Sequence, residues 1–182
     1  CSSDLNLKNP EEIDRWLEAA KGQGQIATVV NITGNLPQIP KLVELSRKEW
    51  DDLVDKFINT PATVVQRALN YFVPGGGADP RLFKDKTGTV VTIGPDLPAG
   101  KVTGIQRAAI EVFRGALRPF TTTVNQELSD VLKSKVRAFL VLPGTVDGKE
   151  PKNENIVQAI NYFVSEYSPS SVIVTFCIDE ER

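Results

Sequence analysis

Residues 87–94 read TGTVVTIG, a run of β-branched and apolar side chains between two segments rich in Gly and Pro. Three further runs have the same character: 25–32 (QIATVVNI), 136–142 (VRAFLVL) and 171–178 (SVIVTFCI). Continuous apolar strands are typical of a parallel sheet that is covered on both faces. The four runs therefore predict the strands of such a sheet.

Helix start signals occur between these runs. Asn9 precedes Pro10, which is the combination expected at a helix N-cap and the first helical residue. Ser46 and Glu49 have the spacing of a capping box, in which each residue satisfies a free backbone N–H of the other. We therefore expect one helix to begin at Pro10 and another to follow Ser46.

Two prolines fall inside the predicted helices. Pro61 predicts a kink or a break in the helix that runs from Ser46 towards Phe72. Pro119 predicts an interruption in a helix over about 103–132, and a last helix covers about 154–166. Strands that alternate with helices in this way predict a doubly wound α/β domain with a parallel sheet.

Composition excludes several classes of function. The chain has 182 residues and a net charge of -2, without the basic surface that a nucleic-acid binder needs. No apolar run reaches the roughly 20 residues that cross a bilayer. Histidine is absent, and Cys1 and Cys177 lack metal-ligand spacing, so imidazole triads and most zinc sites are excluded.

The start of the sequence bears on location. The first residues lack the charged and apolar parts of a signal peptide, so we expect a cytoplasmic protein. The stroma or matrix of an organelle is the alternative if a transit peptide has been removed. Because the sequence contains no Met, we expect further residues to precede Cys1 in the natural protein.

Seven segments, in order, resemble the short-chain dehydrogenase/reductase family. They are DLN (4–6), QIATVVNITG (25–34), ELSRKEWDDLVD (44–55), TGTVVTIG (87–94), IQRAAIEVFRGALR (105–118), VRAFLVLPGTVDG (136–148) and NIVQAINYFVSEYSPSSVIVTFCI (155–178). The resemblance implies a Rossmann-type doubly wound sheet, one domain over 1–182, and NADP(H) as the cofactor. It implies no metal.

The resemblance fails at the catalytic positions. In that family a Ser, a Tyr and a Lys carry out proton transfer during hydride transfer. Here Gly94, Thr103 and Arg107 stand at those positions. A Thr hydroxyl titrates far above neutral pH, and Arg stays protonated, so neither replaces the lost groups. The family's helical Asn falls at Phe57, with Asn59 two residues away.

The resemblance also begins only at the family's third strand. The glycine-rich phosphate loop follows the family's first strand, and Gly75–Gly77 does not replace it because that run follows a helix. The family's first two strands lie beside the fourth, which corresponds to 25–32. Without them, this strand has an unpaired edge. We expect an upstream segment or an adjacent domain to complete the sheet.

Five residues are candidates for cofactor binding by resemblance. Asp4 either contacts an adenine ring or caps the next turn. Asn31 and Gly34 either lie against a ribose or form an ordinary strand-end turn. Pro143 and Gly144 either lie beside the nicotinamide or form a common strand-to-helix connection.

Three arginines, Arg107, Arg114 and Arg118, recur on the predicted helix over 103–132. We expect them to form a solvated or interface face rather than a phosphate clamp. Family members pair through this helix and the one over 46–73, so the resemblance implies a homo- or heterodimer. We expect no nucleic-acid or membrane partner.

Three functions remain open. The run TGIQRAAIEVFRGALR (103–118) resembles the altered dehydrogenase-like domain of bacterial malonyl-CoA reductases, which implies a non-catalytic scaffold or interface in a larger NADPH-dependent reductase. An active NAD(P)H-dependent carbonyl oxidoreductase would need relocated catalytic residues, with Tyr71 or Tyr162 as the phenol. A regulatory module would hold a nucleotide or an acyl-CoA without reacting it.

Overall fold

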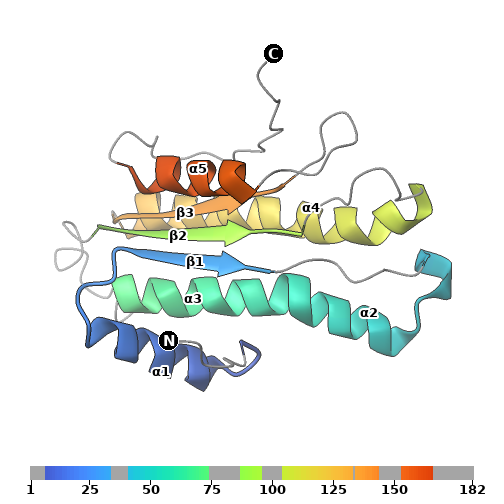
Figure 1. Cartoon of the computed structure of the whole chain (residues 1–182), viewed down its shortest axis with the longest axis horizontal. Coiled ribbons are helices and arrows are strands. Elements are labelled where there is room, and N and C mark those ends of the chain that lie inside the picture. Colours follow the sequence, from blue (N-terminus) through green and yellow to red (C-terminus); the bar gives the residue numbers. More distant parts are fainter. Residues whose placement is uncertain are drawn as a thin grey trace, which may run out of the picture.

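The computed structural model describes residues 7–33, 41–73, 87–95, 104–132, 134–143 and 153–165. Within these ranges three strands form one parallel sheet in the order β1 (Thr28–Ile32), β2 (Thr87–Ile93) and β3 (Lys135–Val141). Figure 1 shows helices on both sides of the sheet. The predicted α/β class with a doubly wound parallel sheet is confirmed, while the strand predicted at 171–178 lies outside the described residues.

In the described part of the chain, five α-helices accompany the sheet, together with short 3-10 and π-helical turns. The α-helices are α1 (Pro10–Lys21), α2 (Arg47–Val54), α3 (Thr60–Phe72), α4 (Gly104–Gln126) and α5 (Asn153–Val164). A 3-10 turn η1 (Leu42–Glu44) precedes α2, and π-helical turns η2 (Asp55–Asn59) and η5 (Glu127–Val131) follow α2 and α4. The helices predicted from the sequence are therefore all present where the structure describes the chain.

Both predicted helix starts are confirmed in atomic detail. The Asn9 side chain accepts a hydrogen bond from the Glu11 backbone N–H at 3.0 Å, and α1 begins at Pro10. At α2 the Ser46 hydroxyl accepts from the Glu49 N–H at 3.2 Å, while the Ser46 N–H donates to the Glu49 carboxylate at 2.8 Å. These bonds satisfy N–H groups that a helix start leaves free.

The two internal prolines behave differently. Pro61 stands in the first turn of α3, directly after the π-helical turn η2. The α-helical pattern changes there, but the helical run from Arg47 to Phe72 is continuous, so Pro61 does not break it. Pro119 lies inside α4, which continues through it, so the predicted interruption is wrong. Pro119 and Gly115, four residues earlier, are both exposed. Water can therefore solvate the Gly115 carbonyl that loses its N–H partner.

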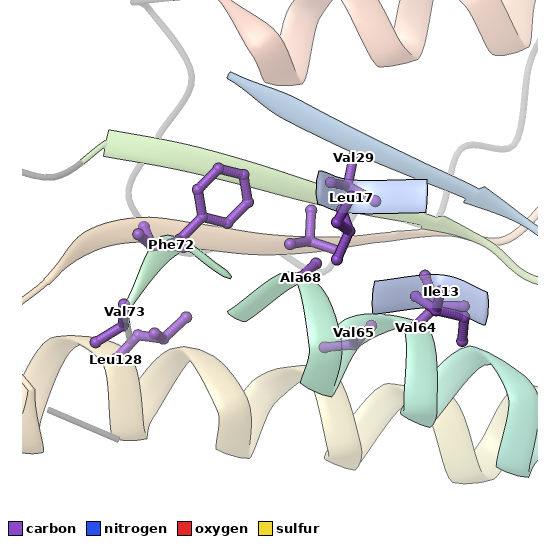
Figure 2. Close-up of a cluster of buried hydrophobic side chains, with 11 residues drawn as sticks. Ile13, Leu17, Val29, Val64, Val65, Ala68, Phe72, Val73 and Leu128 are labelled. Carbon is purple, nitrogen blue, oxygen red and sulfur yellow. The ribbon is translucent and has the colours of Figure 1, made fainter. Parts of the chain in front are cut away.

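One face of the sheet packs against α1 and α3. Figure 2 shows Leu17 and Ala68 beside the β1 residue Val29, with Phe72 and Leu128 further along the same layer. The buried cluster consists of Ile13, Leu17, Val29, Val64, Val65, Ala68, Phe72, Val73, Val90, Leu128 and Val136. Its members come from all three strands, so this cluster joins the sheet to the helices below it.

The other face packs against α5. Val91 and Ile93 of β2 and Phe139 and Val141 of β3 form one buried cluster with Ala159 and Phe163 of α5. The rings of Phe139 and Phe163 stack with their centroids 4.5 Å apart. Since neighbouring residues of a strand point to opposite faces, β2 is buried on both sides.

Gly88 leaves the space that the Phe72 ring fills. A Cβ at Gly88 would lie 2.5 Å from Phe72 Cδ1, which is closer than van der Waals contact allows. We predict that Gly88→Ala lowers the free energy of unfolding by about 1–3 kcal/mol, because the ring must move out of a packed core. Chemical denaturation measures this change.

Gly115 provides the matched control. No atom lies within 4 Å of a Cβ built at this helical glycine. Gly115→Ala should therefore raise the stability by roughly 0.5–1 kcal/mol through helix propensity. Equal effects of the two substitutions would contradict the steric explanation.

Candidate functional site

The carboxyl ends of the three strands meet at one edge of the sheet, where α/β proteins bind ligands. The structure describes Asn31, Gly94 and Pro143 at this edge, and Arg107 only as a backbone position in α4. The other candidates, Asp4, Gly34, Thr103 and Gly144, lie outside the described residues. Their predicted roles therefore stay predictions.

Gly94 follows β2 directly, and its surroundings leave no room for a side chain. A Cβ at Gly94 would lie 2.6 Å from Leu142 Cδ2 and 3.4 Å from Leu117 Cδ1. Leu117, Leu140 and Leu142 form a buried cluster beneath it, here called the Gly94 cluster. The space that a Ser side chain would need is filled by leucine.

Phe57, at the family's helical Asn position, is part of an aromatic cluster. Its side chain is fully buried, and its ring stacks on Phe113 of α4 with centroids 5.5 Å apart. Trp50 packs on the same Phe113 ring at 5.6 Å. The nearby Asn59 amide instead donates to Asp55 Oδ1 at 2.7 Å on the exposed side of the helix. Neither residue offers a polar relay towards α4.

The two tyrosines considered as relocated acids lie elsewhere. Tyr71 packs edge-on against Phe72, which contacts the Gly88 position near the start of β2, at the opposite end from Gly94. Tyr162 belongs to α5 and is 48% exposed. Helix α5 covers the face of Val91 and Ile93, whereas the Gly94 cluster lies on the α4 face. Neither phenol reaches the Gly94 position.

Arg114 corrects an expectation from the sequence. Its side chain is only 4% exposed, and Nη1 donates to the carbonyl oxygens of Pro95 at 3.0 Å and Pro143 at 2.6 Å. The prediction that Arg114 lies on a solvated or interface face is therefore wrong. Arg118, one turn later, is exposed as expected. The difference follows from helical spacing, because Arg114 shares the buried face of Ile110 and Leu117.

A cleft of about 340 Å³ opens at the carboxyl end of β1. It lies between that strand, the start of α1 and the α2–α3 segment, and it is lined by Leu7, Lys8, Asn31, Ile32, Thr33, Asp52, Lys56, Thr60 and Pro61. We call it the Asn31 cleft. Asn31 is 4% exposed, and its side-chain Nδ2 has no hydrogen-bond partner among the described residues.

Thr33 fixes the backbone around Asn31. Its N–H and its hydroxyl both donate to the Ile93 carbonyl oxygen, at 3.1 and 3.0 Å. These bonds extend the pairing of β1 with β2 beyond the end of the strand. A buried amide donor without a partner costs free energy unless a ligand or water accepts its hydrogen bond. The cleft therefore holds a preformed donor on a rigid strand end.

The charges around the Asn31 cleft are mixed. Lys8 forms an ion pair with Asp55 at 3.7 Å, and the Lys56 ammonium lies 5.0 Å from the centre of the Phe57 ring. Lys48 donates a hydrogen bond to Asp52 at 2.9 Å and, through this bond and its charge, lowers the pKa of the Asp52 carboxyl. The cleft thus offers cations, a carboxylate and a neutral amide.

Metal-binding clusters and membrane-spanning helices are both absent from the described residues. No group of three or more His, Cys, Asp or Glu side chains is placed to hold a metal ion there. No helix in the same part of the chain has the length and apolar character to cross a bilayer.

Comparison with solved structures places the fold among known ones. An NADH-dependent reductase A1-R' complexed with NAD superposes with a TM-score of 0.69 at 17% identity, over 93% of this chain and 68% of that chain. A metagenomic short-chain oxidoreductase in complex with NADP gives 0.64 at 17% identity, over 96% and 71%. A short-chain dehydrogenase from Mycobacterium smegmatis gives 0.70 at 17% identity, over 93% and 66%.

These likenesses establish the fold. The chain has the Rossmann-type fold of short-chain dehydrogenases, as the resemblance of its segments implied. It spans about two thirds of the length of these structures. No protein-family model and no curated protein matches the sequence.

Sequence reasoning missed two features of this edge. The burial of Arg114 could have been found from its spacing, since it lies four residues after Ile110 and three before Leu117 on one helix face. The contact between Leu142 and Gly94 had no comparable signal, because it joins two strands that are far apart in the sequence.

The contact at Gly94 leads to a test by double-mutant cycle. Gly94→Ser should lower the free energy of unfolding by about 1–3 kcal/mol, because the new side chain overlaps Leu142. Leu142→Ala should then cost less in the Gly94→Ser background than in the wild type, since it relieves that overlap. Denaturation of the four proteins gives the coupling, and strictly additive losses would contradict the filled space.

Proposed function

We propose that this chain is a non-catalytic, reductase-type domain that serves a larger NADPH-dependent reductase, of the malonyl-CoA reductase kind, as a scaffold or interface. The filled space at Gly94 carries the proposal. Leu142 occupies the volume of the hydroxyl-bearing side chain that orients a carbonyl substrate in active relatives. A single substitution to Ser does not recreate that site.

The neighbouring positions support the same conclusion. Thr103 and Arg107 replace a phenol and an amine whose pKa values suit proton transfer, whereas Thr and Arg do not exchange protons near neutral pH. The buried stack of Phe57 on Phe113 replaces a polar helical residue. Relocation of the acid to Tyr71 or Tyr162 finds no support, because both lie away from Gly94.

The exposed side of β1 supports the role of an incomplete domain. Val30 and Ile32 are 38% and 62% exposed, although they pair in register with the buried Val91 and Ile93. Among the elements that the structure describes, Figure 1 shows β1 at the edge of the sheet with no helix over it on the α5 side. We propose that an upstream segment or an adjacent domain adds a strand to β1 and covers both side chains.

The proposed assembly also includes a dimer. Helices α3 and α4 fall within the two helical segments, 46–73 and 103–132, through which the resemblance implies pairing. The exposed Val112 on α4 suits such an interface. The proposed location is the cytoplasm, or an organelle stroma or matrix.

A second candidate function rests on the Asn31 cleft. The buried amide of Asn31 lacks an acceptor among the described residues, and two of the similar structures contain NAD or NADP. A module that holds a nucleotide or an acyl-CoA without reacting it would supply that acceptor. NADP(H) is the cofactor we propose to test first.

The main proposal predicts that the extended chain does not reduce carbonyl substrates and that the parent enzyme does not need Thr103 or Arg107 for turnover. The chain, extended upstream to a complete sheet, should show no NADPH-dependent reduction of carbonyl substrates above background. Thr103→Ala with Arg107→Ala should leave the turnover of the parent reductase unchanged, because neither residue transfers a proton. Carbonyl reduction at an ordinary enzymatic rate by the extended chain would overturn the proposal.

Isothermal calorimetry of the same extended chain separates the two candidates. A binding module predicts heat on mixing with NADPH, NADH or acyl-CoA, while a pure scaffold predicts none. If NADPH binds, Asn31→Ala should weaken the affinity on the order of tenfold, since the ligand loses a buried hydrogen bond. The exposed Asn70 on α3 provides the control, and Asn70→Ala should bind like the wild type.

A further inference from the structure

Arg114 is the only buried charged side chain among the residues that the structure describes. A guanidinium that leaves water loses hydration, and hydrogen bonds with the protein must offset that loss. The hydrogen bonds of Arg114 therefore offset the cost of burying its charge.

Two of the groups that Arg114 contacts are backbone carbonyls from two different strand ends. Pro95 follows Gly94 at the end of β2, and Pro143 follows Leu142 at the end of β3. One nitrogen, Nη1, donates to both carbonyl oxygens, at 3.0 and 2.6 Å. Hydrogen bonds from a charged donor are shorter and stronger than neutral ones. A single guanidinium therefore sets the distance between the carbonyls of Pro95 and Pro143.

These hydrogen bonds of Arg114 lie directly beyond the last hydrogen bond between β2 and β3. The Gly94 N–H donates to the Val141 carbonyl at 2.8 Å, beyond the end of β2. Arg114 donates a hydrogen bond to the carbonyl of Pro95, the residue after Gly94. Leu117, about one turn further along α4, packs into the Gly94 cluster. Helix α4 thus contributes an apolar contact and a cationic bridge at the same place.

We infer that Arg114 is a positioning residue that holds the carboxyl ends of β2 and β3 together through Pro95 and Pro143. The Asn31 cleft lies beside β1, and Arg114 is not among the residues that line it. This role is independent of the proposed function, since the bridge forms within the chain whether or not a nucleotide binds.

Amide hydrogen exchange of the full chain, followed residue by residue by NMR, tests this role. In Arg114→Met the Gly94 amide should exchange faster, on the order of tenfold, because its bond to Val141 loses the bridge beyond it. The Thr33 amide, which bonds to the Ile93 carbonyl on the β1 side of β2, should change little. Arg118→Met removes an exposed arginine from the same helix and should leave both amides unchanged.

A second variant keeps the test decisive if Arg114→Met does not fold. Arg114→Lys retains a cation that can donate to a carbonyl, so its Gly94 amide should exchange faster than in the wild type, but by less than about tenfold. Equal acceleration at Gly94 and Thr33 would show a general loss of stability and overturn the local role. Exchange at Gly94 equal to that of Arg118→Met, in either Arg114 variant, would overturn it too. NADPH binding is not part of this readout, so its absence would count only against the binding module.

Discussion

Strand β2 lies at the centre of the described sheet, and every one of its residues after Thr87 is buried. A strand buried on both faces needs a hydrogen-bonding neighbour at each edge and a covering layer on each face. Helices α3 and α4 cover one face, and α5 covers the other. This arrangement determines where the Asn31 cleft and the Gly94 cluster lie. The cleft is at the carboxyl end of β1, which pairs with β2, and the cluster is at the carboxyl ends of β2 and β3.

Helix α4 packs against the edge of the sheet where the carboxyl ends of the strands meet. Its buried face carries Phe113, Arg114 and Leu117 in close succession. The stack on Phe57, the bonds to Pro95 and Pro143, and the contact near Gly94 are all made by this one helix.

The β2–β3 side and the β1 side of this edge differ. On the β2–β3 side, leucine side chains fill the space beside Gly94, and Arg114 bridges the carbonyls of Pro95 and Pro143. On the β1 side, the Asn31 cleft keeps a buried donor and mixed charges at its rim. The exposed Val30 and Ile32 lie on the same strand. Ligand binding and assembly with a partner are therefore expected to meet at β1.

Local sequence patterns were sufficient for the elements of this fold. The apolar run at 87–93, the Asn9–Pro10 start and the capping box at Ser46 act between near neighbours, so each pattern specifies its own strand or helix start. That Gly94 carries no side chain was likewise visible along the chain. Three-dimensional packing alone decided that Leu142 fills the space at Gly94 and that Arg114 bridges two turns, because these contacts join residues separated by 19 or more positions.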